Sequence, residues 1–192
     1  IEDTAAASLP KDYHIEWTGL SYQERQNAGQ IVTLMGLALL FAYLFLVAQY
    51  ESWTIPLSVM LSVLFAVMGA LLGLELTGGD MSIYTQLGMV MLIGLAGKNA
   101  ILMVEFAKTA RESGLSIIEA AKQGASIRFR AVMMTAWSFL FGVLPLVFAT
   151  GAGSASRRAI GITTFAGMLT ATLIGIFFIP FLFTLFETLR EK

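Results

Sequence analysis

Five long stretches of the chain contain almost no charged side chains and are separated by polar segments. Each stretch is long enough, at about 1.5 Å of rise per helical residue, to cross the roughly 30 Å of hydrocarbon in a bilayer. The pattern therefore predicts an all-α membrane protein with five membrane-spanning helices, at residues 30–50, 53–75, 82–107, 130–150 and 158–187. Short connections join the first three, so we expect those helices to be antiparallel neighbours.

Three polar segments lie outside the predicted spans. Residues 1–29 predict an extramembrane segment that ends in a lead-in helix, because Ser21 to Glu24 form a capping-box pattern before the first span. Residues 115–126 place apolar side chains on one face and Glu119 and Lys122 on the other, which predicts a short interfacial helix. We favour a linker on the membrane surface over a lipid-binding role for this helix. Residues 188–192 form a polar tail.

The distribution of cations predicts the orientation in the membrane. The loop between the third and fourth spans and the C-terminal tail together carry seven Lys and Arg, against four on the opposite side. By the positive-inside rule, this loop and the C-terminus are cytoplasmic and the N-terminal segment is outside, although Arg157 and Arg158 run against the bias. The chain begins at Ile1 without the order of residues of a signal peptide, so we expect the C-terminal piece of a longer protein.

Composition narrows the class of protein further. The chain is 57% hydrophobic and 13% charged, with a mean hydropathy of +0.76, which is typical of a membrane protein rather than a soluble domain. A net charge of −1 provides no basic field for nucleic acid. Cysteine is absent, and the single histidine, His14, lacks a local ligand pattern, so we expect no metal site. No nucleotide-binding loop or nucleophile elbow occurs, so we expect neither a cofactor nor enzymatic activity.

Lys98 is the most informative candidate for function, because it lies inside the third predicted span. Apart from its neighbour Asn99, the surrounding stretch has no strongly polar side chain. A cation in the bilayer interior costs at least about 2.5 to 3.5 kcal/mol, so such residues usually face a partner or a water path. A merely structural ion pair is the less favoured alternative, because desolvation makes such pairs poor stabilisers. No Asp or Glu of this chain is predicted at the depth of Lys98, because Glu75 and Glu105 lie nearer the two membrane surfaces, so we expect the counter-charge to come from outside this chain.

Small residues predict where helices approach closely. Gly94 lies one turn before Lys98 on the same face, which would let another helix, and a carboxylate on it, come near the ammonium. Gly69 and Gly73 form a GxxxG pattern in the second span, which we interpret as a packing feature. Glu105 lies two turns beyond Lys98, near the end of its span, and we favour an interface anchor over a relay role for it.

Further polar and aromatic residues give weaker signals. Thr135 lies seven residues beyond Arg128, roughly on the same helical stripe of the fourth span. A lone threonine in a membrane helix usually bonds the carbonyl four residues earlier, so Thr135 alone is weak evidence for chemistry. Tyr50 and Trp53 lie at positions typical of aromatic residues at the membrane interface.

Several stretches resemble one family of bacterial transporters. The stretch 94–107, Gly-Leu-Ala-Gly-Lys-Asn-Ala-Ile-Leu-Met-Val-Glu-Phe-Ala, closely resembles the resistance–nodulation–division (RND) efflux pumps, in particular the hydrophobe/amphiphile, AcrB-like inner-membrane subunits. Residues 17–25, 50–56, 128–135 and 144–153 support the same resemblance in the same order along the chain. The combination of motifs is specific, although no single motif is.

The resemblance implies a proton-driven multidrug antiporter that confers antibiotic resistance and works as a homotrimer in the bacterial inner membrane. It implies a periplasmic adaptor and an outer-membrane channel as partners. This chain would form the last five helices of the transmembrane bundle, with residues 1–29 as the end of the periplasmic porter domain. Lys98, Asn99, Thr135 and Arg128 match the family's proton-relay positions, and the aspartate pair that faces the lysine would lie in the missing N-terminal half. Ala131 stands where the family often has proline.

The sequence alone leaves two other interpretations of the function open. One is a protein-export or sterol-sensing member of the same superfamily, which shares the helix layout. The other is a non-transport structural module of a membrane complex, with Lys98 as a docking charge. The stretch 94–107 favours the drug pump over both.

Overall fold

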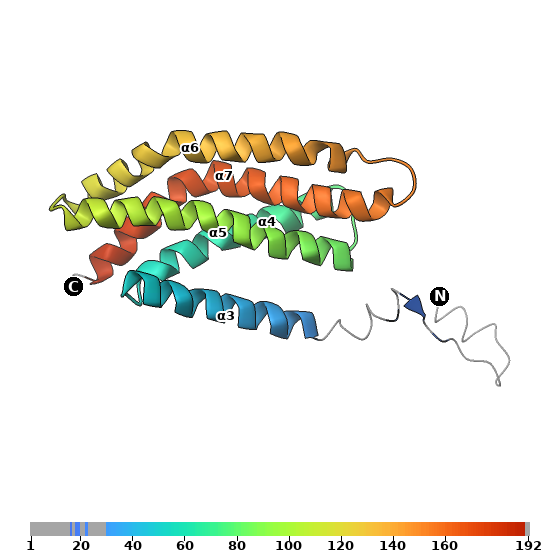
Figure 1. Cartoon of the computed structure of the whole chain (residues 1–192), viewed down its shortest axis with the longest axis horizontal. Helices are drawn as coiled ribbons and strands as arrows, with labels where there is room; N and C mark the ends of the chain where they lie inside the picture. Colours follow the sequence, from blue (N-terminus) through green and yellow to red (C-terminus); the bar gives the residue numbers. More distant parts are fainter. Residues whose placement is uncertain (1–15, 17, 20–21, 23–29, 191–192) are drawn as a thin grey trace. The chain divides into compact units, whose positions relative to one another are not determined.

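The computed structural model describes residues 16, 18–19, 22 and 30–190. Within 30–190 the chain forms the helices α3 (Gln30–Tyr50), α4 (Ile55–Leu76), α5 (Ile83–Glu112), α6 (Ile117–Val147) and α7 (Ser154–Arg190), and no described residue is in a strand (Figure 1). The capping-box pattern predicted at 21–24, most of the predicted segment 1–29 and the end of the tail lie outside the described residues. The chain divides into units at 1–38 and 39–192, and the second holds the helix bundle.

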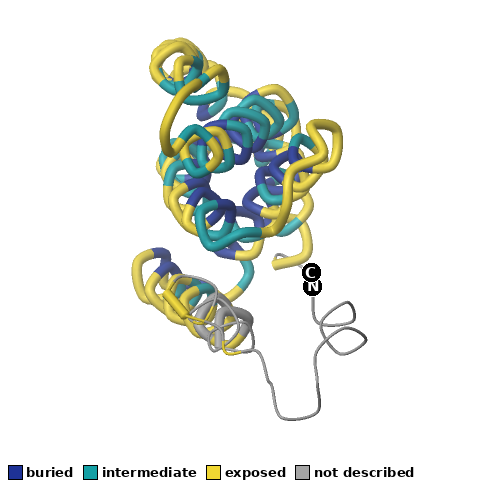
Figure 2. Tube along the Cα trace, turned by 90° about the vertical axis from the view of Figure 1, so that its right-hand side faces the viewer, coloured by how far each residue is buried: buried dark blue, intermediate teal, exposed yellow. Residues whose placement is uncertain are grey.

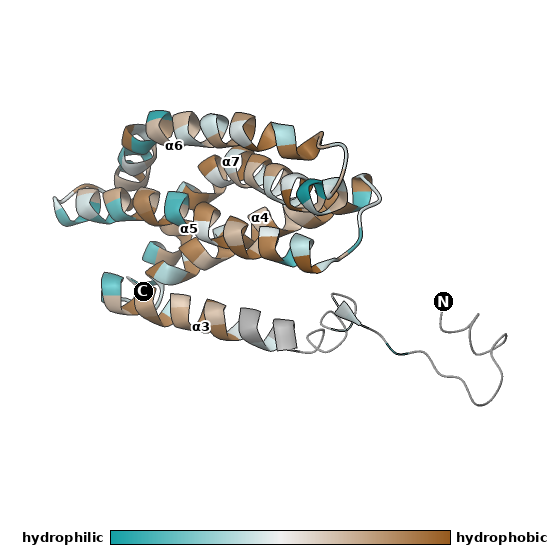
Figure 3. Cartoon of the chain, turned by 45° about the vertical axis from the view of Figure 1, so that its right-hand side comes forward, coloured by the Kyte–Doolittle hydropathy of each residue, from teal (hydrophilic) through white to brown (hydrophobic). Residues whose placement is uncertain are grey.

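The prediction of an all-α membrane protein is confirmed. Helices α4, α5, α6 and α7 are each long and apolar enough to cross a bilayer. In α3, the apolar part within the described residues is the shorter segment Gly36–Tyr50, so the first of the five predicted spans stays a prediction. Hydrophobic residues predominate along these helices (Figure 3), and many large ones are exposed, among them Phe141 and Phe177.

Helix α7 packs against each of α4, α5 and α6, while α5 also packs against α4 and α6 (Figure 1). In the end-on view of Figure 2, the buried residues of the bundle lie mainly on the inner sides of the helices. Between lipid-embedded helices the hydrophobic effect gives little drive, so close contact through small residues matters more. A Cβ atom at Gly69 would overlap the side chain of Thr170, and one at Gly73 would overlap Ala166. The GxxxG pattern of α4 therefore lies where α4 meets α7.

The structure differs from the prediction of a separate interfacial helix at 115–126. Helix α6 begins at Ile117 and continues without a break through the fourth predicted span to Val147. Its start is a capping box, in which the Ser116 hydroxyl accepts from the backbone N–H of Glu119 and the Glu119 carboxylate accepts from the backbone N–H of Ser116. No proline or capping residue then ends the helix before the apolar stretch, so one helix forms, with a bend along its length in Figure 1.

Candidate functional site

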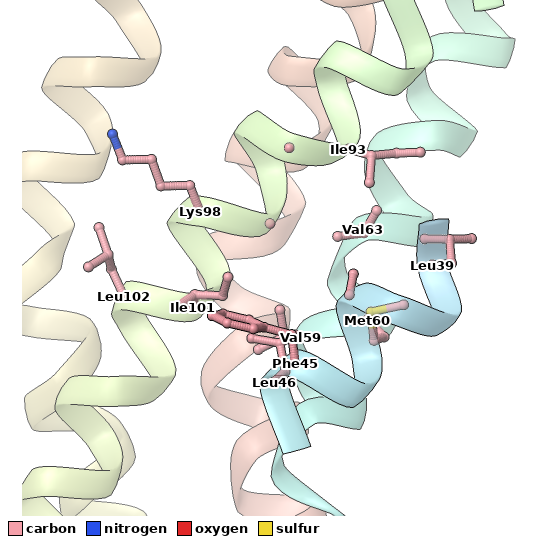
Figure 4. Close-up of a pocket in the computed structure, with 13 residues that line it drawn as sticks. Leu39, Phe45, Leu46, Val59, Met60, Val63, Ile93, Lys98, Ile101 and Leu102 are labelled. Carbon is pink, nitrogen blue, oxygen red and sulfur yellow. The ribbon is translucent and has the colours of Figure 1, made fainter. Parts of the chain in front are cut away.

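Lys98 lies near the middle of α5, and its side chain is exposed. In Figure 4 the ammonium points away from the side chains of α3 and α4. Among the residues that the structure describes, no carboxylate forms an ion pair with Lys98 and no group accepts a hydrogen bond from it. The charge thus lies on the surface of an apolar helix without compensation from the described part of the chain.

A groove of about 350 Å³ lies between α3, α4 and α5, and Lys98 is at its edge (Figure 4). Its lining is apolar apart from Lys98, and Gly94 and Gly97 form the part contributed by the backbone of α5. A Cβ atom at Gly94 would meet no other atom within 4 Å. No described helix therefore packs against Gly94, and the close approach predicted there stays a prediction.

Asn99 faces the interior of the bundle, next to a void of about 10 Å³ that is also lined by Ser62 and Thr172. The Ser62 hydroxyl donates to the Val59 carbonyl at 2.6 Å, and the Thr172 hydroxyl donates to the Met168 carbonyl at 2.7 Å. Each oxygen therefore keeps acceptor capacity. Asn99 has no hydrogen bond to the described residues. A void of this size, with three polar groups around it, has about the room that one water molecule needs.

Thr135 behaves as a threonine in a membrane helix usually does. Its hydroxyl donates to the carbonyl oxygens of Ala131 and Val132, at 3.0 Å each, and its side chain is exposed. The expectation that a lone threonine bonds its own helix is confirmed by these contacts. Thr135 on α6 and Lys98 on α5 are both exposed on helices that pack together, although no hydrogen bond joins them.

Arg128 is half-buried against α5 rather than free on the surface of α6. Its guanidinium carbon lies 4.0 Å from the centre of the Phe106 ring, a close cation–π contact. The Nε atom is buried and has no hydrogen-bond partner among the described residues. Sequence reasoning identified Arg128 as a candidate but missed Phe106, because an apolar residue in a predicted span carries no signal of its own.

Glu105 is half-buried near the end of α5. Its backbone carbonyl accepts from the Thr109 hydroxyl at 3.0 Å, and its carboxylate forms no ion pair with the residues that the structure describes. These contacts do not distinguish between the two predicted roles of Glu105, an anchor at the membrane interface and a member of the relay, and both stay predictions. In residues 16, 18–19, 22 and 30–190 no group of acidic residues or histidines could hold a metal ion.

Tyr50 and Trp53, which the sequence predicts at the membrane interface, differ in how far they are exposed. Trp53 is 66% exposed, as an interfacial residue would be, whereas Tyr50 is only 1% exposed. The Tyr50 hydroxyl donates to the Ile101 carbonyl of α5 at 3.0 Å. Tyr50 is therefore buried between helices rather than exposed, and its predicted depth at the membrane interface stays a prediction. Leu46, one turn earlier on the same face, is also buried, but in a span that is apolar all round the sequence gives no sign of which face that is.

Comparison with known proteins gives matches along nearly the whole chain. Residues 1–187 match the AcrB/AcrD/AcrF family. The chain is 42% identical over 184 residues to the toluene efflux pump membrane transporter TtgB of Pseudomonas putida. It is 45% identical over 187 residues to the multidrug resistance protein MdtF and 42% over 182 residues to the multidrug export protein AcrF, both of Escherichia coli. These alignments cover 94 to 97% of this chain but only 18% of each relative.

Proposed function

Because this chain belongs to the AcrB/AcrD/AcrF family, we propose that it is the C-terminal transmembrane portion of a proton-driven drug efflux transporter. It is a multi-pass membrane protein, and its relatives include a toluene efflux pump membrane transporter and a multidrug export protein. The observation that carries the proton-driven part is Lys98, an exposed cation in the middle of a membrane-length helix with no counter-charge among the described residues. Such a residue is expected to face a partner or a water path.

The mechanism is an electrostatic switch at Lys98. Carboxylates in a part of the transporter outside this chain hold the ammonium while they are ionised. Protonation of these carboxylates from the outside weakens the attraction, so Lys98 swings away and helices α5 and α6 shift. One local charge change then biases an element with two positions, which is the usual form of such coupling.

Three further residues have proposed roles in the relay. The partner helix would lie against the exposed side chains of Lys98 and Thr135, and the Thr135 hydroxyl can accept a hydrogen bond in addition to the one it donates within its helix. Asn99 supplies a polar group between α5 and the bundle interior, next to the void with Ser62 and Thr172. Arg128 places a fixed positive charge near the other end of the α5–α6 contact.

The same proposal assigns location and partners. Lipid surrounds the bundle in the bacterial inner membrane, with the N-terminal segment in the periplasm and the basic loop and C-terminus in the cytoplasm. Residues 1–29 belong to the end of the porter domain. The transporter is a homotrimer that works with a periplasmic adaptor and an outer-membrane channel.

Substitution of Lys98 in the complete transporter tests the proposal. Lys98→Ala should abolish drug export, because no ammonium is then left to respond when the carboxylates are protonated. The amount of protein in the membrane should stay unchanged. Lys122→Ala is the matched control, since Lys122 is exposed on the polar first part of α6. Accumulation of a fluorescent drug in cells measures export. Normal export by the Lys98→Ala variant would show that the proposed mechanism is wrong.

A further inference from the structure

The described part of α3 from Leu39 onward contacts the rest of its unit mainly at one end. Leu46 and Tyr50 are the only buried residues among those of α3 whose exposure is described, while Phe41 and Phe45 are more than 60% exposed. The attachment of this helix therefore depends on a few residues near its C-terminus, and Tyr50 has the largest of the buried side chains there.

Tyr50 is bonded to α5 through its side chain. The hydroxyl donates to the Ile101 carbonyl at 3.0 Å, and Ile101 lies one turn of α5 beyond Lys98. Figure 4 shows both Lys98 and Ile101 on this stretch of α5. The ring packs in a core cluster with Val104 of α5 and Phe183 of α7. A shift of α5 at Lys98 would therefore move the acceptor of this hydrogen bond.

Tyr50 is also held through its backbone. Helix α3 ends at Tyr50, and Glu51 follows with a φ of 51°, the left-handed conformation in which helices often end. The Tyr50 carbonyl, which has no partner within the helix, accepts from the Lys108 ammonium of α5 at 3.2 Å. The same ammonium lies 5.8 Å from the centre of the Tyr50 ring and 3.7 Å from the Glu112 carboxylate.

We propose that Tyr50 and Lys108 form a clamp that couples α3 to movements of α5, so that the two residues are positioning residues for energy transduction. Two turns of α5, from Ile101 to Lys108, thus hold the last residue of α3 by its hydroxyl and its carbonyl. The coupling role rests on the proposed function, since it needs Lys98 to move α5. The clamp itself rests only on these contacts.

The chain offers a matched control for the tyrosine hydroxyl. Tyr43 is also on α3, and its hydroxyl donates to the Trp53 carbonyl at 2.8 Å, within the segment that follows α3 rather than on α5. Tyr50→Phe and Tyr43→Phe each remove one hydroxyl and one bond to a carbonyl, but only Tyr50→Phe removes a bond to α5. For the cation, Lys108→Gln removes the charge at the clamp, and Lys122→Gln removes one elsewhere.

Chemical labelling of a cysteine in the complete transporter tests the clamp without a measurement of transport. This chain contains no cysteine, so Leu46→Cys, in a transporter freed of cysteines elsewhere, provides a single thiol at a buried position of α3. We expect Tyr50→Phe and Lys108→Gln each to increase the rate of maleimide labelling of this thiol about five-fold. This factor corresponds to the net free energy that one hydrogen bond contributes to the closed state. Tyr43→Phe and Lys122→Gln should leave labelling unchanged. Equal labelling of the Tyr50→Phe and Tyr43→Phe variants would overturn the clamp.

Transport measurements test the coupling. In proteoliposomes, Tyr50→Phe should lower the amount of drug exported per proton taken up several-fold, whereas Tyr43→Phe should leave this ratio unchanged. An unchanged ratio together with increased labelling would overturn the coupling role and leave only a structural contact. Failure of the proposed function has a different signature, namely normal export by Lys98→Ala, and the labelling result does not depend on it.

Discussion

At the scale of single residues, the bundle depends on positions where no side chain fits. Gly124 of α6 is the clearest case, because a Cβ atom there would lie 2.6 Å from the backbone nitrogen of Ala107 and 2.9 Å from its Cα. Backbone atoms inside a helix cannot move aside as a flexible side chain can. Gly142, on the same helix, has no atom within 4 Å of such a Cβ.

Replacement of these two glycines should have opposite effects. Gly124→Ala forces α5 and α6 apart and should lower the free energy of unfolding by about 1 to 3 kcal/mol. Gly142→Ala should be neutral or stabilising by up to about 1 kcal/mol, because alanine restricts the unfolded chain. Thermal unfolding in detergent measures both. Equal stability of the two variants would contradict the packing of α6 against α5.

The contact of Arg128 with Phe106 gives a second test at this scale. A cation–π contact contributes about 0.5 to 2 kcal/mol, depending on how far it is desolvated. Arg128→Gln and Phe106→Leu should each destabilise the protein, and the double variant should lose less than the sum of the two. A double-mutant cycle on the free energy of unfolding measures the coupling. Strict additivity would mean that the two side chains do not interact.

At the scale of helices, the sequence predicted the spans better than their ends. Long charge-free stretches predict a membrane-length helix because a helix satisfies all its backbone hydrogen bonds within one segment, as hydrocarbon requires. Helix ends depend on local capping, and Ser116 with Glu119 begins α6 well before its apolar part. Tyr50 shows a second limit, because its burial depends on where α5 lies, and that position cannot be inferred from the composition of α3.

The capping box of α6 can be tested directly. Ser116→Ala removes the acceptor for the Glu119 N–H and should destabilise the first turn of α6 by about 1 kcal/mol. Hydrogen exchange of the amides in the first turn of α6 should become several-fold faster. Ser138→Ala is the control, because that hydroxyl only donates to the Met134 carbonyl within the same helix. Unchanged exchange in the Ser116 variant would mean that another group begins the helix.

At the scale of the whole molecule, the main question is which group neutralises the charge of Lys98. Its location in an apolar helix could be predicted from the sequence alone, and the structure adds that no described residue neutralises it. The proposed relay roles of Thr135, Asn99 and Arg128 rest on the resemblance, because no contact joins these side chains to one another or to Lys98 among the described residues. The chain spans 18% of the length of the relatives it matches.

Proton flux through the complete transporter tests the central claim most directly. In proteoliposomes that hold a pH-sensitive dye, addition of drug should start proton movement in the unmodified transporter. Lys98→Ala should abolish this drug-dependent flux, whereas Lys122→Ala should leave it unchanged. Drug-dependent proton flux of normal size in the Lys98→Ala variant would contradict the account, because Lys98 would then not be part of the proton site.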